Sequence, residues 1–191
     1  YRWAEWNGKF RDDVRSFVFA QGQMIPIYAD AATSQRLHAA FGYCFKTPQG
    51  SAYPPILIDN RIAHDTPFNV NGQGGAIRFE PLYQHHGGIH SLGFRIGDFA
   101  YCPDVSAMPE ATMDKLSGLD ALIIDALQYR EHPSHFSLAQ ALDMIERLAP
   151  RRAFLTHMHI PLDYDTVLAE TPDHVAPCFD GQVIETVLLE R

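Results

Sequence analysis

Several features that would assign this 191-residue sequence to a special class of protein are scarce or absent. Its three cysteines, Cys44, Cys102 and Cys178, are odd in number and lack paired spacing, which excludes a disulfide scaffold and favours the reducing cytoplasm. No hydrophobic run is long enough to span a membrane, and no signal-peptide pattern opens the chain. An initiating methionine is also missing, so we expect a fragment or a processed form.

Positive charge is in short supply as well. Lysine and arginine number 15 against 23 aspartate and glutamate residues, for a net charge of −8. This balance disfavours nucleic acids and anionic membranes as partners of the surface as a whole. A small anionic substrate stays compatible with it, because a bound metal ion can reverse the local field. With 46% hydrophobic residues, the chain should form a folded domain.

The hydrophobic pattern predicts an α/β protein with a mixed sheet flanked by helices, because strands come first and then alternate with helices. The clearest helix spans 134–148, with Ser134 as its expected N-cap, and Gly97-Asp98 is expected to join a hairpin. Further helices are expected at 10–20, 33–41, 109–116 and 163–170. Strands are expected at 24–28, 55–59, 68–70, 76–82, 91–96, 99–102, 121–126, 153–156 and 183–189.

Three polar clusters lie just after predicted strands: Gln84-His85-His86-Gly87, Pro103-Asp104 and Thr156-His157-Met158-His159. Strand ends in an open α/β sheet meet in a common crevice. Imidazole and carboxylate groups gathered there suit zinc or manganese. The simpler alternatives are loop histidines and a turn aspartate, and spacing alone does not decide between these and a shared metal site.

Two more residues have side chains that could take part in catalysis or support a metal site. His135 lies at the start of the predicted long helix, where it could serve as a general acid or base or could be a surface residue of the capping region. Asp125 ends an apolar strand, and its carboxylate could orient a metal-ligating histidine or could bind backbone. His132 is open to the simpler interpretation of an exposed loop residue.

These residues carry a resemblance. The chain, from about Asp12 onward, resembles the metallo-β-lactamase-fold hydrolases similar to the phosphoribosyl cyclic phosphate phosphodiesterase of phosphonate breakdown. The matching stretches, specific only in combination, are Gln84-His85-His86-Gly87, Ser91-Leu92-Gly93-Phe94-Arg95, Tyr101-Cys102-Pro103-Asp104-Val105, His132-Pro133-Ser134-His135-Phe136-Ser137-Leu138, Leu155-Thr156-His157-Met158-His159 and Phe179-Asp180-Gly181.

The resemblance implies a role for each matching residue. His86 would be a metal ligand, and Asp104 would be the catalytic carboxylate that bridges two metal ions. His157 would be the last histidine ligand, with His159 as its rival for that role. His135 would be the catalytic histidine that helps to protonate the leaving group. Two ions in this site would activate a water molecule and neutralise phosphate oxygens.

The chain also departs from that family. The first metal motif, His-x-His-x-Asp-His, and the strand-rich lobe around it should precede Asp12-Asp13-Val14-Arg15, and both are absent. Residues 1–15 instead resemble a short segment of glycogen-debranching glycosidases, without a catalytic acid pair. We therefore expect a single truncated metallo-β-lactamase-like domain over 1–191, with 1–11 foreign or irregular, and an incomplete site for one or two zinc or manganese ions.

The leading hypothesis is thus a metal-dependent hydrolase, most simply a cytoplasmic phosphodiesterase that acts on a small phosphodiester and is impaired by the missing motif. The alternative is a non-catalytic fragment or interaction module that keeps the fold without metal. A third hypothesis, a glucan-binding piece, rests on Trp3, Trp6 and Asn7. Because a half-sheet would expose an apolar face and an edge strand, a homodimer is also expected.

Overall fold

The computed structural model describes residues 9–186, with side chains from residue 14 onward. The chain divides into two compact units, Tyr1–Ala63 and His64–Arg191. The first unit contains α1 (Lys9–Gln21), β1 (Ile25–Ala29), α2 (Ala31–Phe41), a 3-10 turn η2 (Gly42–Cys44) and β2 (Leu57–Arg61). The second contains β3 (Phe68–Gly72), β4 (Gly75–His86), β5 (Ile89–Ile96), β6 (Phe99–Cys102), α3 (Glu110–Asp114), β7 (Ala121–Asp125), α4 (Leu138–Leu148), β8 (Arg152–Thr156), α5 (Tyr164–Glu170) and β9 (Val175–Pro177).

The first unit is built on two parallel strands joined through α2. Strand β1 pairs with β2 from Ile25 opposite Leu57 onward, and Val18 of α1 and Ile56 belong to the small core of this unit. Asp30 caps α2 by accepting a hydrogen bond from the backbone N–H of Thr33 at 2.8 Å. The helix therefore begins earlier than a cap at 33 or 34 would allow.

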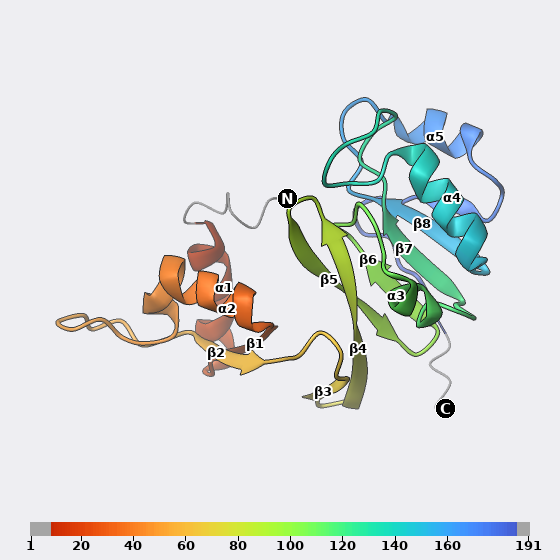
Figure 1. The fold of residues 1–191 in the computed structure, drawn as a ribbon. Coiled ribbons are helices and arrows are strands. Elements are labelled where there is room, and N and C mark those ends of the chain that lie inside the picture. Colours follow the sequence, from red (N-terminus) through yellow and green to blue (C-terminus); the bar gives the residue numbers. More distant parts are fainter. Residues whose placement is uncertain (1–8, 187–191) are drawn as a thin grey trace. The chain divides into compact units, whose positions relative to one another are not determined.

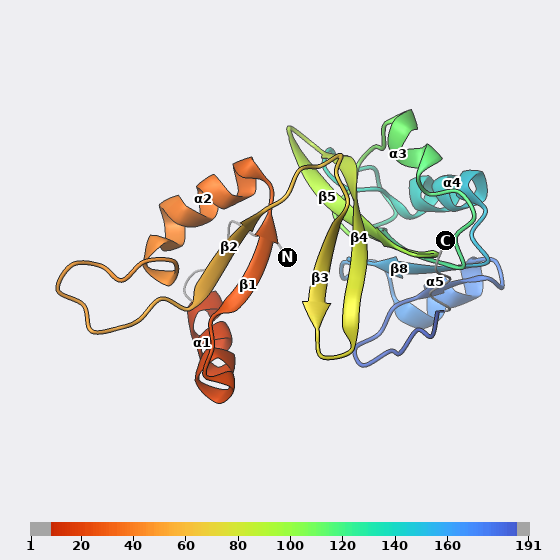
Figure 2. The same cartoon turned by 90° about the horizontal axis from the view of Figure 1, so that it is seen from below.

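The second unit is a seven-stranded mixed sheet in the order β3-β4-β5-β6-β7-β8-β9, with the helices α3, α4 and α5 (Figures 1 and 2). The pairs from β3 to β6 are antiparallel, whereas those from β6 to β9 are parallel. Since β5 runs against both of its neighbours, β4 and β6 point the same way. The carboxyl ends of β4, β6, β7, β8 and β9 therefore share one edge of the sheet.

One face of this sheet packs against the helices and forms the larger core. Alternate residues of the central strands supply it, among them Leu82, Leu122 and Leu155, all fully buried or nearly so. Helix α4 adds its apolar face (Leu138, Ala141, Met144 and Ile145). Burying each large aliphatic side chain contributes roughly 1.5–3 kcal/mol, so this layer holds the strand ends in place.

The structure confirms the α/β class and corrects several boundaries. Helix α4 begins at Leu138 rather than 134, because Ser137 and Gln140 form a reciprocal capping box there. The strand expected at 183–189 is wrong for 183–186, which are irregular, and the remainder lies outside the described residues. Strand β9, which has only three residues and ends in Pro177, was missed by the sequence pattern.

Two further expectations concern the whole chain. The single truncated domain stays a prediction, and residues 1–8 of the segment expected to be foreign lie outside the described residues. Within 9–186, none of the helices is both long and apolar enough to cross a membrane.

Candidate metal centre

The shared edge of the sheet brings the predicted site residues together. His86 is the last residue of β4, Asp104 follows β6 by two residues, and His157 directly follows β8. These three strands point the same way, so their carboxyl ends reach one edge. The topology thus brings the three strand ends to one edge, and the role of each residue stays a prediction.

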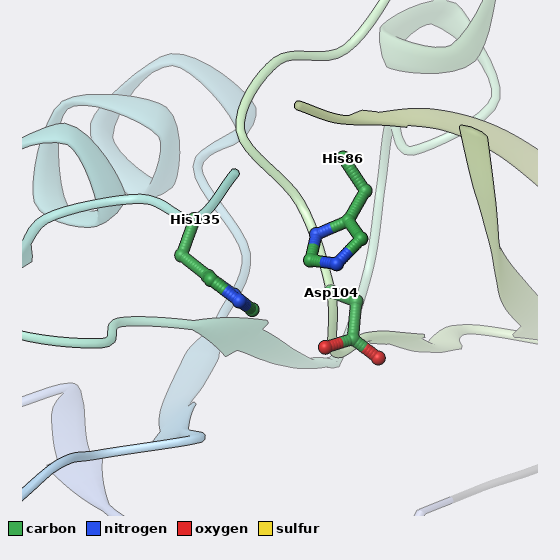
Figure 3. A group of neighbouring side chains, drawn as sticks. All are labelled: His86, Asp104 and His135. Carbon is green, nitrogen blue, oxygen red and sulfur yellow. The ribbon is translucent and has the colours of Figure 1, made fainter. Parts of the chain in front are cut away.

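Three side chains converge most closely. His86, Asp104 and His135 each offer one ligand atom, and these atoms lie within 4.8 Å of one another (Figure 3). His86 and Asp104 come from strand ends, whereas His135 comes from the loop before α4. In Figure 3 both imidazoles point toward the Asp104 carboxylate. The set consists of two imidazoles and one carboxylate, the donor types that zinc prefers.

The orientation of His86 is set by the loop that faces it. Its Nδ1 lies 2.6 Å from the carbonyl oxygen of Ser134, so Nδ1 carries the proton and Nε2 keeps a free lone pair. The loop can approach because Gly87, at φ 61°, has no side chain; a Cβ there would lie 3.0 Å from Cβ of Ser134. Ser134, expected as a helix cap, thus acts through its carbonyl.

His135 is held from behind by a buried carboxylate. Its Nδ1 lies 2.6 Å from Oδ2 of Asp125, and the same oxygen accepts the backbone N–H of Val105 at 3.0 Å. Asp125 is fully buried, and burial raises its pKa although the hydrogen bonds from His135 and Val105 act the other way. His135 therefore also presents Nε2 to the site.

The surroundings of His135 differ from the prediction in one respect. The residue precedes the Ser137 N-cap rather than lying at the first turn of α4, so the helix dipole does not act on it as expected. The centroid of its ring instead lies 4.6 Å from the ring centroid of His86 and 4.6 Å from that of His157. The His135 and His157 rings are stacked.

The two rival histidines have different positions. Nδ1 of His157 lies 3.8 Å from Oδ1 of Asp104, and the residue adopts the left-handed conformation, with φ 64°. Burial lowers the pKa of His157, and the nearby His135 and His86 lower it further while Asp104 opposes them. His159, by contrast, is exposed and donates its backbone N–H to the Leu127 carbonyl at 2.9 Å.

Ser91 is a supporting residue that residue-level reasoning did not single out. Its hydroxyl donates to the carbonyl oxygen of Asp104 at 2.5 Å and so fixes the backbone that carries the carboxylate. The feature that could have identified Ser91 is the strand register, which places it opposite Gln84 on β5, between β4 and β6. That register could not be known before the hairpin pairing was seen.

The converging residues fit a metal ion. With bonds near 2.1 Å, ligand atoms around one tetrahedral zinc lie roughly 3.4 Å apart. The three ligand atoms lie within 4.8 Å of one another, so the side chains would have to move closer together around such an ion. Both histidines already have Nδ1 engaged and Nε2 available, which is the usual arrangement around protein-bound zinc.

The sequence pattern of one protein family matches residues 11–158, described as a beta-lactamase superfamily domain. The chain belongs to this family. A diphosphatase from the PhnP family has a similar structure, with a TM-score of 0.80 and 29% sequence identity over 93% of this chain and 66% of that one. The family assignment and this likeness agree with the metallo-β-lactamase fold seen here.

Two other relatives extend the comparison. The zinc-bound PqqB from Methylobacterium extorquens matches with a TM-score of 0.66 and 14% identity, over 86% of this chain and 66% of that one, which shows the fold alone. An octanoyltransferase of Porphyromonas gingivalis is 29% identical over 94% of this chain. The chain spans only 35% of that transferase and just under two thirds of the diphosphatase.

Proposed function

We propose that the chain is a metal-dependent hydrolase that cleaves small phosphodiesters with a metal-activated water. The observation that carries this proposal is the convergence of His86, Asp104 and His135 within 4.8 Å at the carboxyl edge of the sheet. Zinc or manganese suits this donor set. When bound, such an ion would lower the pKa of a coordinated water and neutralise charge on a phosphate oxygen.

The residues divide into ligands and a proton donor. His86 and Asp104 would hold the ion, and His157 would complete the set, because its Nδ1 faces the Asp104 carboxylate. His135 would deliver a proton from Nε2 to the departing oxygen, since Asp125 bonds its Nδ1 and holds the ring in place. His135 also lies close enough to act as a ligand, and the two roles are separated by the experiment below.

A phosphate-containing substrate is favoured over other substrates because this chain is 29% identical to a protein named a diphosphatase of the PhnP family, and the match covers 93% of this chain. An anionic phosphate would enter a surface of net charge −8 only where the ion reverses the local field. Acyl transfer is not proposed, because the name octanoyltransferase belongs to a protein of which the chain matches about a third of the length.

A second candidate is a non-catalytic interaction module that keeps the fold and binds no metal. It would apply if the three converging side chains, whose ligand atoms lie up to 4.8 Å apart, did not close around an ion. In that case a homodimer would be the expected state. Glucan binding, the weaker hypothesis, concerns Trp3, Trp6 and Asn7, which lie outside the described residues.

Metal content separates these functions. Purified chain should contain close to one equivalent of zinc or manganese by mass spectrometry, and Asp104→Ala should lose it. Asp173→Ala, a change at an exposed loop aspartate, should keep it. Folded wild type that takes up neither metal would refute the hydrolase and favour the interaction module.

The role of His135 can be tested by measuring metal content and hydrolysis in a His135 variant. His135→Gln should retain metal and lose hydrolysis of bis(p-nitrophenyl) phosphate if the residue is the proton donor. Loss of metal in this variant would assign it to the ligands instead. Hydrolysis by wild type that survives complete removal of metal by a chelator would contradict the proposed chemistry.

A further inference from the structure

A glutamine without a hydrogen-bond partner lies in the core beneath the candidate metal centre. Gln84 is on β4, two residues before His86, and therefore faces the same side of the sheet. It is fully buried, and neither its Nε2 nor its Oε1 has a hydrogen-bond partner in the described part of the chain. Native proteins rarely leave such a group unsatisfied, so a specific reason is required.

Gly93 supplies the space that this side chain occupies. Gly93 is on β5 and lies opposite Leu82, so it is the diagonal neighbour of Gln84 on the same face. A Cβ at Gly93 would overlap Oε1 of Gln84 and would lie 2.7 Å from the carbonyl oxygen of Tyr101 on β6. The side-chain amide of Gln84 therefore lies over β5 at Gly93, on the side of β6.

The amide oxygen and the Tyr101 carbonyl are both acceptors, and they converge on the same point above Gly93. Half a turn about the last side-chain bond exchanges Oε1 and Nε2 and replaces this pair of acceptors with a donor and an acceptor. The exchange leaves the outline of the side chain unchanged and would turn the buried N–H group toward the Tyr101 carbonyl.

We propose that Gln84 is a positioning residue whose Nε2 donates to the Tyr101 carbonyl and ties β4 to β6 across β5. This bond would fix the distance between His86 and Asp104. His86 lies two residues after Gln84, and Asp104 lies three residues after Tyr101. Ser91, directly opposite Gln84, supports the same row by donating to the Asp104 carbonyl. The consequence for metal binding rests on the proposed function, whereas the hydrogen bond does not.

The bond can be tested by NMR on the metal-free chain. The side-chain amide of Gln84 is assigned by its disappearance in Gln84→Met, an apolar replacement of similar size. Its protons should exchange with solvent at least about tenfold more slowly than those of the exposed Gln73. Exchange as fast as that of Gln73 would overturn the proposal.

The positioning role has its own readout and a matched control. The ring N–H proton of His86, bonded to the Ser134 carbonyl, should be visible in wild type and in Leu82→Met but lost in Gln84→Met. Leu82 is equally buried and lies two residues before Gln84 on the same face of β4, so Leu82→Met reports the effect of replacing a buried side chain there by methionine. An unchanged His86 signal in folded Gln84→Met would reduce Gln84 to a structural residue.

A zinc titration of the same three proteins then addresses the proposed function separately. Gln84→Met should bind zinc about tenfold more weakly than wild type, as expected for loss of a supporting interaction, and Leu82→Met should not. If wild type bound no zinc while the NMR results held, the hydrolase proposal would fail and the inference about Gln84 would stand.

Discussion

Oδ2 of Asp125 lies 2.6 Å from Nδ1 of His135, and both side chains are buried. The same oxygen also accepts the backbone N–H of Val105, the residue directly after Asp104. One carboxylate therefore holds the candidate proton donor and the backbone next to the candidate metal ligand at the same time. Any displacement of Asp125 would be transmitted to both halves of the centre.

Asp125→Ala should consequently destabilise the fold and disturb the site. It leaves the Val105 N–H and the His135 ring without their buried partner, which should cost about 3 kcal/mol of unfolding free energy. Asp125→Asn keeps an acceptor oxygen and should lose less than half as much. Urea unfolding followed by circular dichroism measures both, and equal losses in the two variants would show that the acceptor does not matter.

Much of the fold could be predicted because local pattern and final structure agree. The hairpin across Gly97-Asp98 is confirmed, since alternating apolar residues flank a turn that needs a flexible glycine. The start of α4 was misplaced because Ser134 and Ser137 are both acceptable caps, and only Ser137 has Gln140 three residues later to complete a capping box. The short β9 has too few residues to give a periodic signal.

The site was less predictable than the fold. Clusters at strand ends indicated His86, Asp104 and His157, but only the sheet topology shows that β4 and β6 point the same way. For Asp125, the sequence left open a bond to a histidine or to backbone, and the structure has both. Such pairings join residues distant in sequence, so no local pattern encodes them.

A second prediction concerns the close approach at Gly87. Gly87→Ala forces a side chain into a left-handed conformation and against Ser134, whose carbonyl orients His86. It should lower the unfolding free energy by about 1–2 kcal/mol and weaken zinc binding. Gly88→Ala is the matched control, because the neighbouring Gly88 has open space around a Cβ and a φ outside the left-handed range. Similar zinc affinity in the two variants would show that the loop contact does not orient His86.

A third prediction distinguishes the two rival histidines. His157→Ala removes a ring that lies beside Asp104 and should weaken zinc binding by at least about tenfold. His159→Ala removes an exposed ring and should leave the affinity unchanged. Competition with a chromophoric chelator measures both constants. The reverse order would assign the ligand role to His159 and would require the loop after β8 to rearrange when metal binds.

The fourth prediction concerns acid stability of the first unit. Burial opposes ionisation of Asp59, but hydrogen bonds from Ser34, His38 and Arg61 outweigh it and hold the Asp59 pKa below its ordinary 3.8. A lowered folded-state pKa gives stability that is present above 3.8 and is lost as the pH falls through the folded value. Asp59→Asn should therefore cost about 1 kcal/mol at pH 7, and the gap between wild type and variant should be smaller at pH 3, which is below the ordinary pKa of 3.8.

Urea unfolding at the two pH values, followed in the full chain, measures this difference. Asp173→Asn, which alters an exposed loop aspartate, controls for the loss of one negative charge. A gap between wild type and Asp59→Asn that persists unchanged at pH 3 would mean that hydrogen-bond geometry, and not the ionised carboxylate, joins α2 to β2. A gap absent at both values would mean that the Ser34 and His38 contacts add nothing to the stability of that unit.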